Sequence, residues 1–208
     1  MSKNPALNLA PGRVGSTLLR AGLLLVIAVG GLGAAGEWRL DAANSSVGFA
    51  TIKNGVVGEG HHFSELSGTI DAQGRAQLKI GLASVDTGIP IRDERMRGLL
   101  FEVATFPSAT VATEVPLADI EPLAVGSSMQ VPLTLTLKLH GSETTLAAVV
   151  RVQRLDARHV LVSTVKPVLV SADDVGLAAG IEKLREIAGL QSISPAVPVS
   201  VVLAFVRH

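Results

Sequence analysis

The chain of 208 residues contains no cysteine and no tyrosine, and aromatic residues make up only 3% of it. Without cysteine, no disulfide bond, thiol nucleophile or cysteine-linked lipid anchor is available, so the fold has to be held by its core and its strand pairing. The sequence also lacks a Gly-x-Ser-x-Gly nucleophile elbow and any catalytic acidic motif. These absences predict a protein that is not an enzyme.

Acidic residues are absent from the first 36 positions, where Lys3, Arg13 and Arg20 are the only charges. The apolar stretch that follows ends in small residues, and together these features predict a signal peptide over residues 1–36 that is cleaved on export. The mature domain would then span residues 37–208, in the periplasm or outside the cell. The alternative is an uncleaved membrane anchor, although the 16 residues after Arg20 fall short of the roughly 20 that span a bilayer.

The predicted mature domain carries 15 basic and 18 acidic residues spread along the chain, with no basic patch. Nucleic acid is therefore an unlikely partner on electrostatic grounds. His61 and His62 are adjacent, so on a strand they would face opposite ways and could not share one metal ion. The other histidines have no ligand spacing, and we expect neither a metal site nor a cofactor.

After residue 38 the apolar residues recur with a period of two, which is typical of strands. In the clearest run, five aliphatic residues from Val131 to Leu139 alternate with polar ones, and Gly141-Ser142 is a plausible hairpin turn into the next strand. The pattern predicts strands over residues 47–52, 56–63, 66–71, 78–85, 109–117, 131–139, 144–152, 160–170 and 197–205. Adjacent antiparallel strands in this number form a sandwich or a closed barrel, and we favour an eight-stranded barrel, because closure removes exposed edges.

Two segments break the strand pattern. Residues 93–100 read as a short helix in which Asp93 and Arg97, one turn apart, could pair. Residues 173–188 read as an amphipathic helix that Ser171 or Asp173 could cap and Gly189 could end. Such a helix either closes one end of a barrel or packs flat on its outside.

In one block of the sequence a predicted strand ends, a turn follows, and a short charged helix begins directly before an apolar patch. This block is Ser84-Val85-Asp86-Thr87-Gly88-Ile89-Pro90-Ile91-Arg92-Asp93-Glu94-Arg95. With the opening Trp38-Arg39-Leu40-Asp41 and the strand Leu133-Thr134-Leu135-Thr136-Leu137, it resembles the YceI-like family of periplasmic, polyisoprenoid-binding, lipocalin-like proteins. The resemblance covers residues 38–205. It implies an elongated all-β, lipocalin-like antiparallel barrel with an apolar tunnel for a polyisoprenoid or similar long-chain lipid.

The aliphatic composition suits a tunnel for a flexible hydrocarbon, although the same residues could fill a solid core. As ligand-binding residues we predict Phe49, Phe63, Leu100, Phe101, Phe106, Leu133, Leu135, Leu137, Leu203 and Phe205. Arg92 or Arg95 could hold a phosphate or carboxylate head group at the tunnel mouth. The alternative is structural: Asp93 pairs with Arg97, and Arg92 ties its loop to the barrel.

The function predicted from these observations is an exported protein that sequesters or carries a polyisoprenoid, quinone-like or long acyl-chain molecule. Its expected partners are that lipid and, transiently, a membrane, while the oligomeric state stays open, with a dimer as one option. The rival hypothesis is a non-enzymatic envelope protein with a solid barrel that acts through a protein partner. Ligand release would need an opening, and the two segments that interrupt the strand pattern are the candidates.

Overall fold

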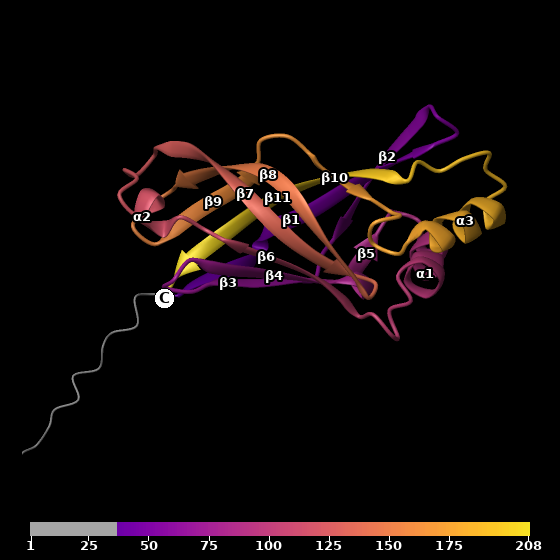
Figure 1. Cartoon of the computed structure of the whole chain (residues 1–208), viewed down its shortest axis with the longest axis horizontal. Helices are drawn as coiled ribbons and strands as arrows, with labels where there is room; N and C mark the ends of the chain where they lie inside the picture. Colours follow the sequence, from indigo (N-terminus) through magenta and orange to yellow (C-terminus); the bar gives the residue numbers. More distant parts are fainter. Residues whose placement is uncertain (1–36) are drawn as a thin grey trace, which may run out of the picture. The chain divides into compact units, whose positions relative to one another are not determined.

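The computed structural model describes residues 37–208, so the predicted signal peptide lies outside the described residues. The described part is mostly antiparallel sheet (Figure 1). Its strands are β1 (Trp38–Lys53), β2 (Val57–Phe63), β3 (Leu66–Ile70), β4 (Arg75–Gly81), β5 (Val85–Asp86), β6 (Ser108–Glu114), β7 (Ser128–Leu139), β8 (Ser142–Arg154), β9 (His159–Thr164), β10 (Val168–Ser171) and β11 (Ala196–Arg207). Its helices are α1 (Pro90–Arg95), α2 (Leu117–Ile120) and α3 (Ala178–Ile187), with a 3₁₀ turn over Leu82–Ser84 and a π-helical turn over Met96–Leu100.

Eight of these strands close into a barrel in the order β1-β11-β9-β8-β7-β6-β4-β3 and back to β1. Closure occurs at Trp38, which pairs with Arg207 of β11 on one side and with Ile70 of β3 on the other. The predicted eight-stranded antiparallel barrel is therefore confirmed. Strands β2, β5 and β10 are additions, and β2 continues the pairing of β1 from Val47 to Lys53, beyond the reach of β3.

The arm predicted over residues 160–170 is not one strand. It divides into β9 and β10, and the last hydrogen bond to β8 runs from the Val165 amide to the Val149 carbonyl. Pro167 follows, and because proline has no N–H to donate, the ladder with β8 ends there. Strand β10 pairs with β11 instead.

The hairpin between β7 and β8 turns one residue earlier than predicted. Leu139 pairs with Ser142, so the turn residues are His140 and Gly141 rather than Gly141 and Ser142. Their φ angles are +50° and +78°. A two-residue turn with positive φ at both positions matches the twist of the flanking strands, and glycine takes the second position without strain.

The helix predicted over residues 93–100 begins earlier, with Pro90 in its first turn, and continues from α1 into the π-helical turn. The predicted pair between Asp93 and Arg97 is wrong. The Asp93 carboxylate instead accepts hydrogen bonds from the backbone amide and the hydroxyl of Thr87, and Arg97 donates to the Ala83 carbonyl.

The second predicted helix is shorter than residues 173–188, because α3 begins only at Ala178. Neither Ser171 nor Asp173 caps it, since the N-cap position is Leu177. Gly176, with φ of +70°, is not helical and delays the start. Gly189 does end the helix, with a φ of +62°.

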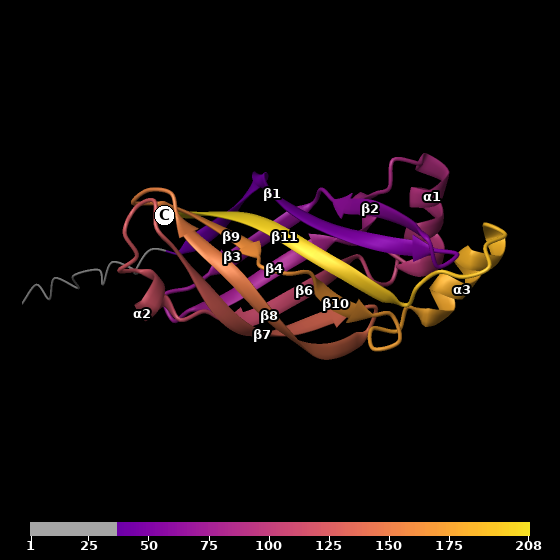
Figure 2. The same cartoon turned by 90° about the horizontal axis from the view of Figure 1, so that it is seen from above.

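The helices divide between the two ends of the barrel. Figures 1 and 2 show α2 beside the chain's C-terminus at one end, and α1 and α3 side by side at the other. We call the end with α2 the closed end and the end with α1 and α3 the open end.

Candidate ligand-binding site

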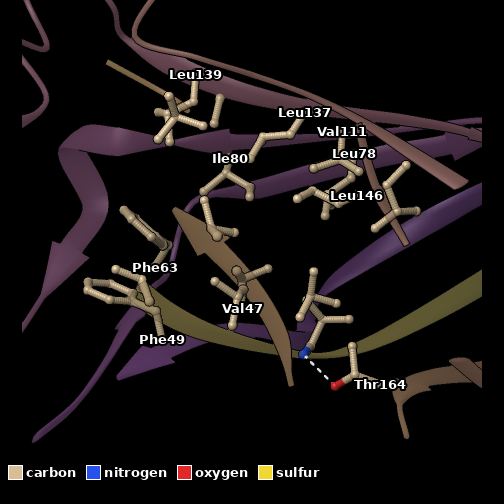
Figure 3. Close-up of a pocket in the computed structure, with 18 of the residues that line it drawn as sticks. Val47, Phe49, Phe63, Leu78, Ile80, Val111, Leu137, Leu139, Leu146 and Thr164 are labelled. Carbon is tan, nitrogen blue, oxygen red and sulfur yellow. Dashed lines mark hydrogen bonds between the residues drawn. The ribbon is translucent and has the colours of Figure 1, made fainter. Parts of the chain in front are cut away.

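The inward side chains of the barrel strands surround a cavity of about 580 Å³. An eight-stranded barrel has room for one small ligand, and binding cavities commonly range from about 300 to 1,000 Å³. Figure 3 shows side chains of β1, β2, β4, β6, β7 and β8 converging on this space from all sides. Strand alternation explains the lining: Val131, Leu133, Leu135, Leu137 and Leu139 of β7 all line the cavity.

The closed end is built around Trp38, which lines the cavity and is only 2% exposed. The guanidinium groups of Arg154 and Arg207 lie 6.0 and 5.5 Å from the centre of its ring. Arg154 is itself buried and donates to the carbonyls of Ile120 and Glu121 at the end of α2. Cation–π contact and these hydrogen bonds fix α2 across the barrel, so the cavity ends there.

At the open end the cavity reaches solvent. Ile89 and Ile91 line it and yet are 45% and 53% exposed. One face of α3 completes this end through Ile181, Leu184 and Ala188. Ile187, the last residue of α3, is exposed and does not line the cavity. Apolar side chains that contact both cavity and water mark this end as the entrance.

Most polar residues of the lining gather at the open end, on β1, β2 and α1. Glu59 accepts a hydrogen bond from Arg92 at 2.6 Å and lies 2.8 Å from the Lys53 ammonium group. The hydrogen bond from Lys53, with the nearby charge of Arg92, holds the pKa of the Glu59 carboxyl below its usual value. Arg92 also donates to the hydroxyl and the carbonyl of Thr87. Helix α1 is thereby tied to the β1–β2 hairpin.

Two residues further along each strand, toward Phe49 on β1 and Phe63 on β2, Thr51 and His61 form a second polar contact. The threonine hydroxyl lies 3.0 Å from Nε2 of the ring. His61 is 7% exposed, and burial is the main cause that lowers its pKa. Its ring also lies 5.2 Å from that of Phe49, which stacks on Phe63. The lining thus changes from charged to neutral polar to aromatic along the hairpin.

Nine of the ten residues predicted to bind the ligand line this cavity. The exception is Phe106, whose ring lies 4.4 Å from that of His140 beside the β7–β8 turn. Phe106 follows the π-helical turn in an irregular segment, so strand alternation could not place it. Both arginines predicted to hold a head group line the cavity. Arg92 forms an ion pair with Glu59 and donates a hydrogen bond to Thr87. Within residues 37–208, Arg95 has no such partner.

The prediction missed several lining residues, including Thr51 and His61. Strand alternation could have found both, because Thr51 lies two residues after Phe49 and His61 two residues before Phe63. The lining by Ile89, Ile91 and the face of α3 depends on how the helices fold back over the barrel, and no local pattern indicates that.

Among residues 37–208, no three histidine or acidic side chains are grouped so that they could hold a metal ion. No helix in that part of the chain is both long and apolar enough to cross a membrane.

A closed antiparallel eight-stranded barrel with an apolar cavity that opens at one end has the architecture of the lipocalin-like proteins. The comparison with protein families agrees. The YceI-like domain model matches residues 38–205, and the chain belongs to the YceI-like family.

Among solved structures, a polyisoprenoid-binding domain from Saccharophagus degradans, implicated in plant cell wall breakdown, is 44% identical, with a TM-score of 0.81 over 84% of this chain and 99% of that domain. BcnA from Burkholderia cenocepacia is 20% identical, with a TM-score of 0.62 over 79% of this chain and 98% of the other. The YCEI protein of Campylobacter jejuni, at 14% identity and a TM-score of 0.51, covers 71% of this chain and 84% of its own. The last two show the fold alone. No curated protein sequence matches the chain.

Proposed function

We propose that this protein binds the hydrocarbon chain of a polyisoprenoid, quinone-like or long acyl lipid in its barrel and sequesters or carries it in the periplasm or outside the cell. The observation that carries the proposal is the apolar cavity of about 580 Å³, open at one end. The 44% identical domain from Saccharophagus degradans is a polyisoprenoid-binding domain, which supports the same class of ligand. The basic and apolar start of the chain, outside the described residues, supports export.

Binding would be driven by desolvation. Each CH₂ group that leaves water for the cavity contributes at most about 0.8 kcal/mol. Ten such groups would therefore supply up to about 8 kcal/mol, which corresponds to micromolar affinity before the cost of association is subtracted. No reacting group is needed for this, in agreement with a binding protein rather than an enzyme.

We assign the two arginines different roles in this function. Arg92 holds α1 to the barrel through Glu59 and Thr87, so its removal would disturb the entrance as a whole. Arg95 lines the cavity and is the one that could meet a phosphate or carboxylate head group at the rim. Replacing Arg95 with alanine should then weaken binding of an anionic lipid and leave stability unchanged. Unchanged occupancy by that lipid would remove Arg95 from this role.

Release requires an opening, and we place it at α3 and the segment that contains Arg92. Of the ten residues of α3, only Gly180 is buried, whereas the segment after the helix is hydrogen-bonded to Asn54 of the hairpin tip. The helix is therefore held mainly at one point and at its C-terminal connection. Hydrogen exchange that is as slow in α3 as in the barrel strands would contradict this gate.

A matched pair of variants on β8 tests the binding function. Ala148 is buried and lines the cavity, whereas its neighbour Ala147 is exposed on the outer face. Ala148→Phe should fill the cavity and abolish lipid uptake, and Ala147→Phe should leave uptake intact. Native mass spectrometry of protein from its own host's periplasm, followed by organic extraction, measures the occupancy and identifies the lipid.

The outcomes separate the proposal from its rival. A stoichiometric adduct of lipid mass in the unmodified protein and in Ala147→Phe, absent from Ala148→Phe, supports a carrier. A clean protein mass in all three, unchanged after incubation with candidate lipids, overturns lipid binding and favours action through a protein partner.

A further inference from the structure

The contact between Thr51 and His61 leaves one polar atom without a partner. Nε2 of the imidazole lies 3.0 Å from the Thr51 hydroxyl, but Nδ1 is fully buried and has no hydrogen-bond partner among the described residues. Buried polar groups are nearly always paired, because an unpaired one loses its bonds to water without replacement. Both residues line the cavity, so a missing partner could come from a ligand.

The charges around His61 offset one another. The side chains that influence it are Arg92, Glu59, Lys53 and Asp93, two cations and two anions. Glu59 contacts both cations, and Thr87 donates two hydrogen bonds to Asp93. Among the cations of residues 37–208 that line the cavity, Arg95 is the one without an ion pair, and the leading influences on the pKa of His61 come from other groups. An anionic head group would therefore find no uncompensated positive charge beside this ring.

His61 itself supplies no charge near neutral pH, because burial lowers its pKa. A neutral imidazole offers one N–H donor and one lone pair, and the Thr51 hydroxyl both donates and accepts. In the ring position described, Nδ1 is enclosed; a half-turn about the Cβ–Cγ bond would exchange it with a ring carbon and would release the Thr51 hydroxyl from Nε2. The pair can thus satisfy an alcohol, which donates and accepts, or a carbonyl, which accepts.

We propose that Thr51 and His61 form a hydrogen-bonding subsite inside the cavity for an uncharged hydroxyl or carbonyl oxygen of the bound lipid. This inference rests on the proposed lipid-binding function and adds the chemical class of the ligand's polar group. The inward residues of β2 run from Phe63 through His61 to Glu59. The oxygen would lie between the aromatic wall and the ion pairs, deeper than a charged group held at the rim by Arg95.

The test compares two ligands with the same chain: the C20 prenyl alcohol geranylgeraniol and the prenyl hydrocarbon that lacks its hydroxyl. Equimolar amounts compete for the full protein, and native mass spectrometry measures the ratio bound. One net hydrogen bond should favour the alcohol by about 3- to 10-fold in the unmodified protein. Thr51→Val, which keeps the side-chain shape, combined with His61→Phe, which replaces the imidazole by a slightly larger apolar ring, removes both polar groups and should abolish this preference.

His62→Phe is the matched control, because His62 is adjacent on β2, 53% exposed at its side chain, and lies near Asp86 outside the cavity. It should retain the preference. The ¹⁵N resonances of the imidazoles provide a direct readout: the His61 signal, assigned by its loss in His61→Phe, should shift with the alcohol and not with the hydrocarbon. Thr51→Val alone keeps the histidine and should reduce the preference, so the test does not depend on the folding of a single variant.

Three results would overturn the subsite: equal binding of alcohol and hydrocarbon by the unmodified protein, a preference that survives in the double variant, or an unmoved His61 resonance. A prenyl diphosphate that binds more tightly than the alcohol and depends on His61 would also overturn the assignment to an uncharged oxygen. If neither ligand binds, the lipid-binding function itself fails. That outcome is distinct from the equal binding that would defeat the subsite alone.

Discussion

The two ends of the barrel use charged side chains in opposite ways. At the closed end, Arg154 and Arg207 lie against the ring of Trp38, and Arg154 also donates to the carbonyls of Ile120 and Glu121 at the end of α2. Charge and aromatic surface together close this end. At the open end, Arg92 and Lys53 share Glu59, while exposed isoleucines lead into the cavity. One end is stabilised by burial and the other is kept accessible. The comparison supports the proposal that a lipid chain would enter between α1 and α3 and extend toward Trp38.

The largest expected effect comes from opening the closed end. Trp38→Ala should lower the free energy of unfolding by about 3–5 kcal/mol, because it removes a buried indole and the surface on which two guanidinium groups lie. Ile91→Ala at the open end should stay within about 0.5 kcal/mol, since its side chain is half exposed. Urea denaturation of both variants measures the difference. Equal losses would show that the two ends do not differ in the way described.

The contact of α3 with the π-helical turn should be the next most sensitive point. A Cβ atom at Gly180 would lie 2.9 Å from the Cα of Leu100 and from the Leu99 carbonyl oxygen. Gly180→Val should therefore displace α3 at a cost of about 1–3 kcal/mol and increase hydrogen exchange in the helix. A Cβ at Gly98 would meet nothing within 4 Å, so Gly98→Ala is the control. Unchanged exchange in Gly180→Val would argue against this contact as the attachment of α3.

Removing the tie between α1 and the hairpin should have a smaller effect. Arg92→Ala breaks the contacts with Glu59 and Thr87 and should cost about 1–2 kcal/mol. Arg95→Ala, in the same helix and without such contacts, should change stability by less than about 0.5 kcal/mol. Thermal denaturation of the two variants measures this. A loss in Arg95→Ala as large as in Arg92→Ala would show that Arg95 is structural and not available to a ligand.

The smallest effect concerns the pH dependence of the open end. Burial lowers the pKa of His61 in the folded state below the ordinary histidine value of about 6.5, so on acidification the unfolded chain takes up this proton first. The contribution of His61 to the free energy of unfolding therefore falls as the pH drops below about 6.5. The charged side chains that influence this titration are those of Arg92, Lys53, Glu59 and Asp93. His61→Phe should flatten the stability profile between about pH 7.5 and 5.5, and His62→Phe should not. A profile unchanged in His61→Phe would show that His61 titrates alike in both states.

Much of the cavity wall was predictable because strand alternation is a local property. Leu133, Leu135 and Leu137 share one face of their strand because alternate side chains of a pleated strand point the same way. Since these side chains are apolar, that face turns toward the inside of the barrel. The same reasoning correctly separated His61 from His62. It failed at Phe106, where the chain is irregular, and at the arm from Val160 to Val170, where Pro167 ends one ladder and the chain joins another.

The sequence by itself therefore determined the strand character of the chain and most of the apolar lining, since both follow from a period of two. Only the tertiary structure decided what lies at each end. Trp38 meets Arg154, and Arg92 meets Glu59, across separations of 116 and 33 residues. Such contacts depend on barrel closure and on how α1 and α3 fold over the entrance. No local pattern contains that information, because Trp38 and Arg154 become neighbours only when the barrel closes, and Arg92 and Glu59 only when β5 pairs with β2.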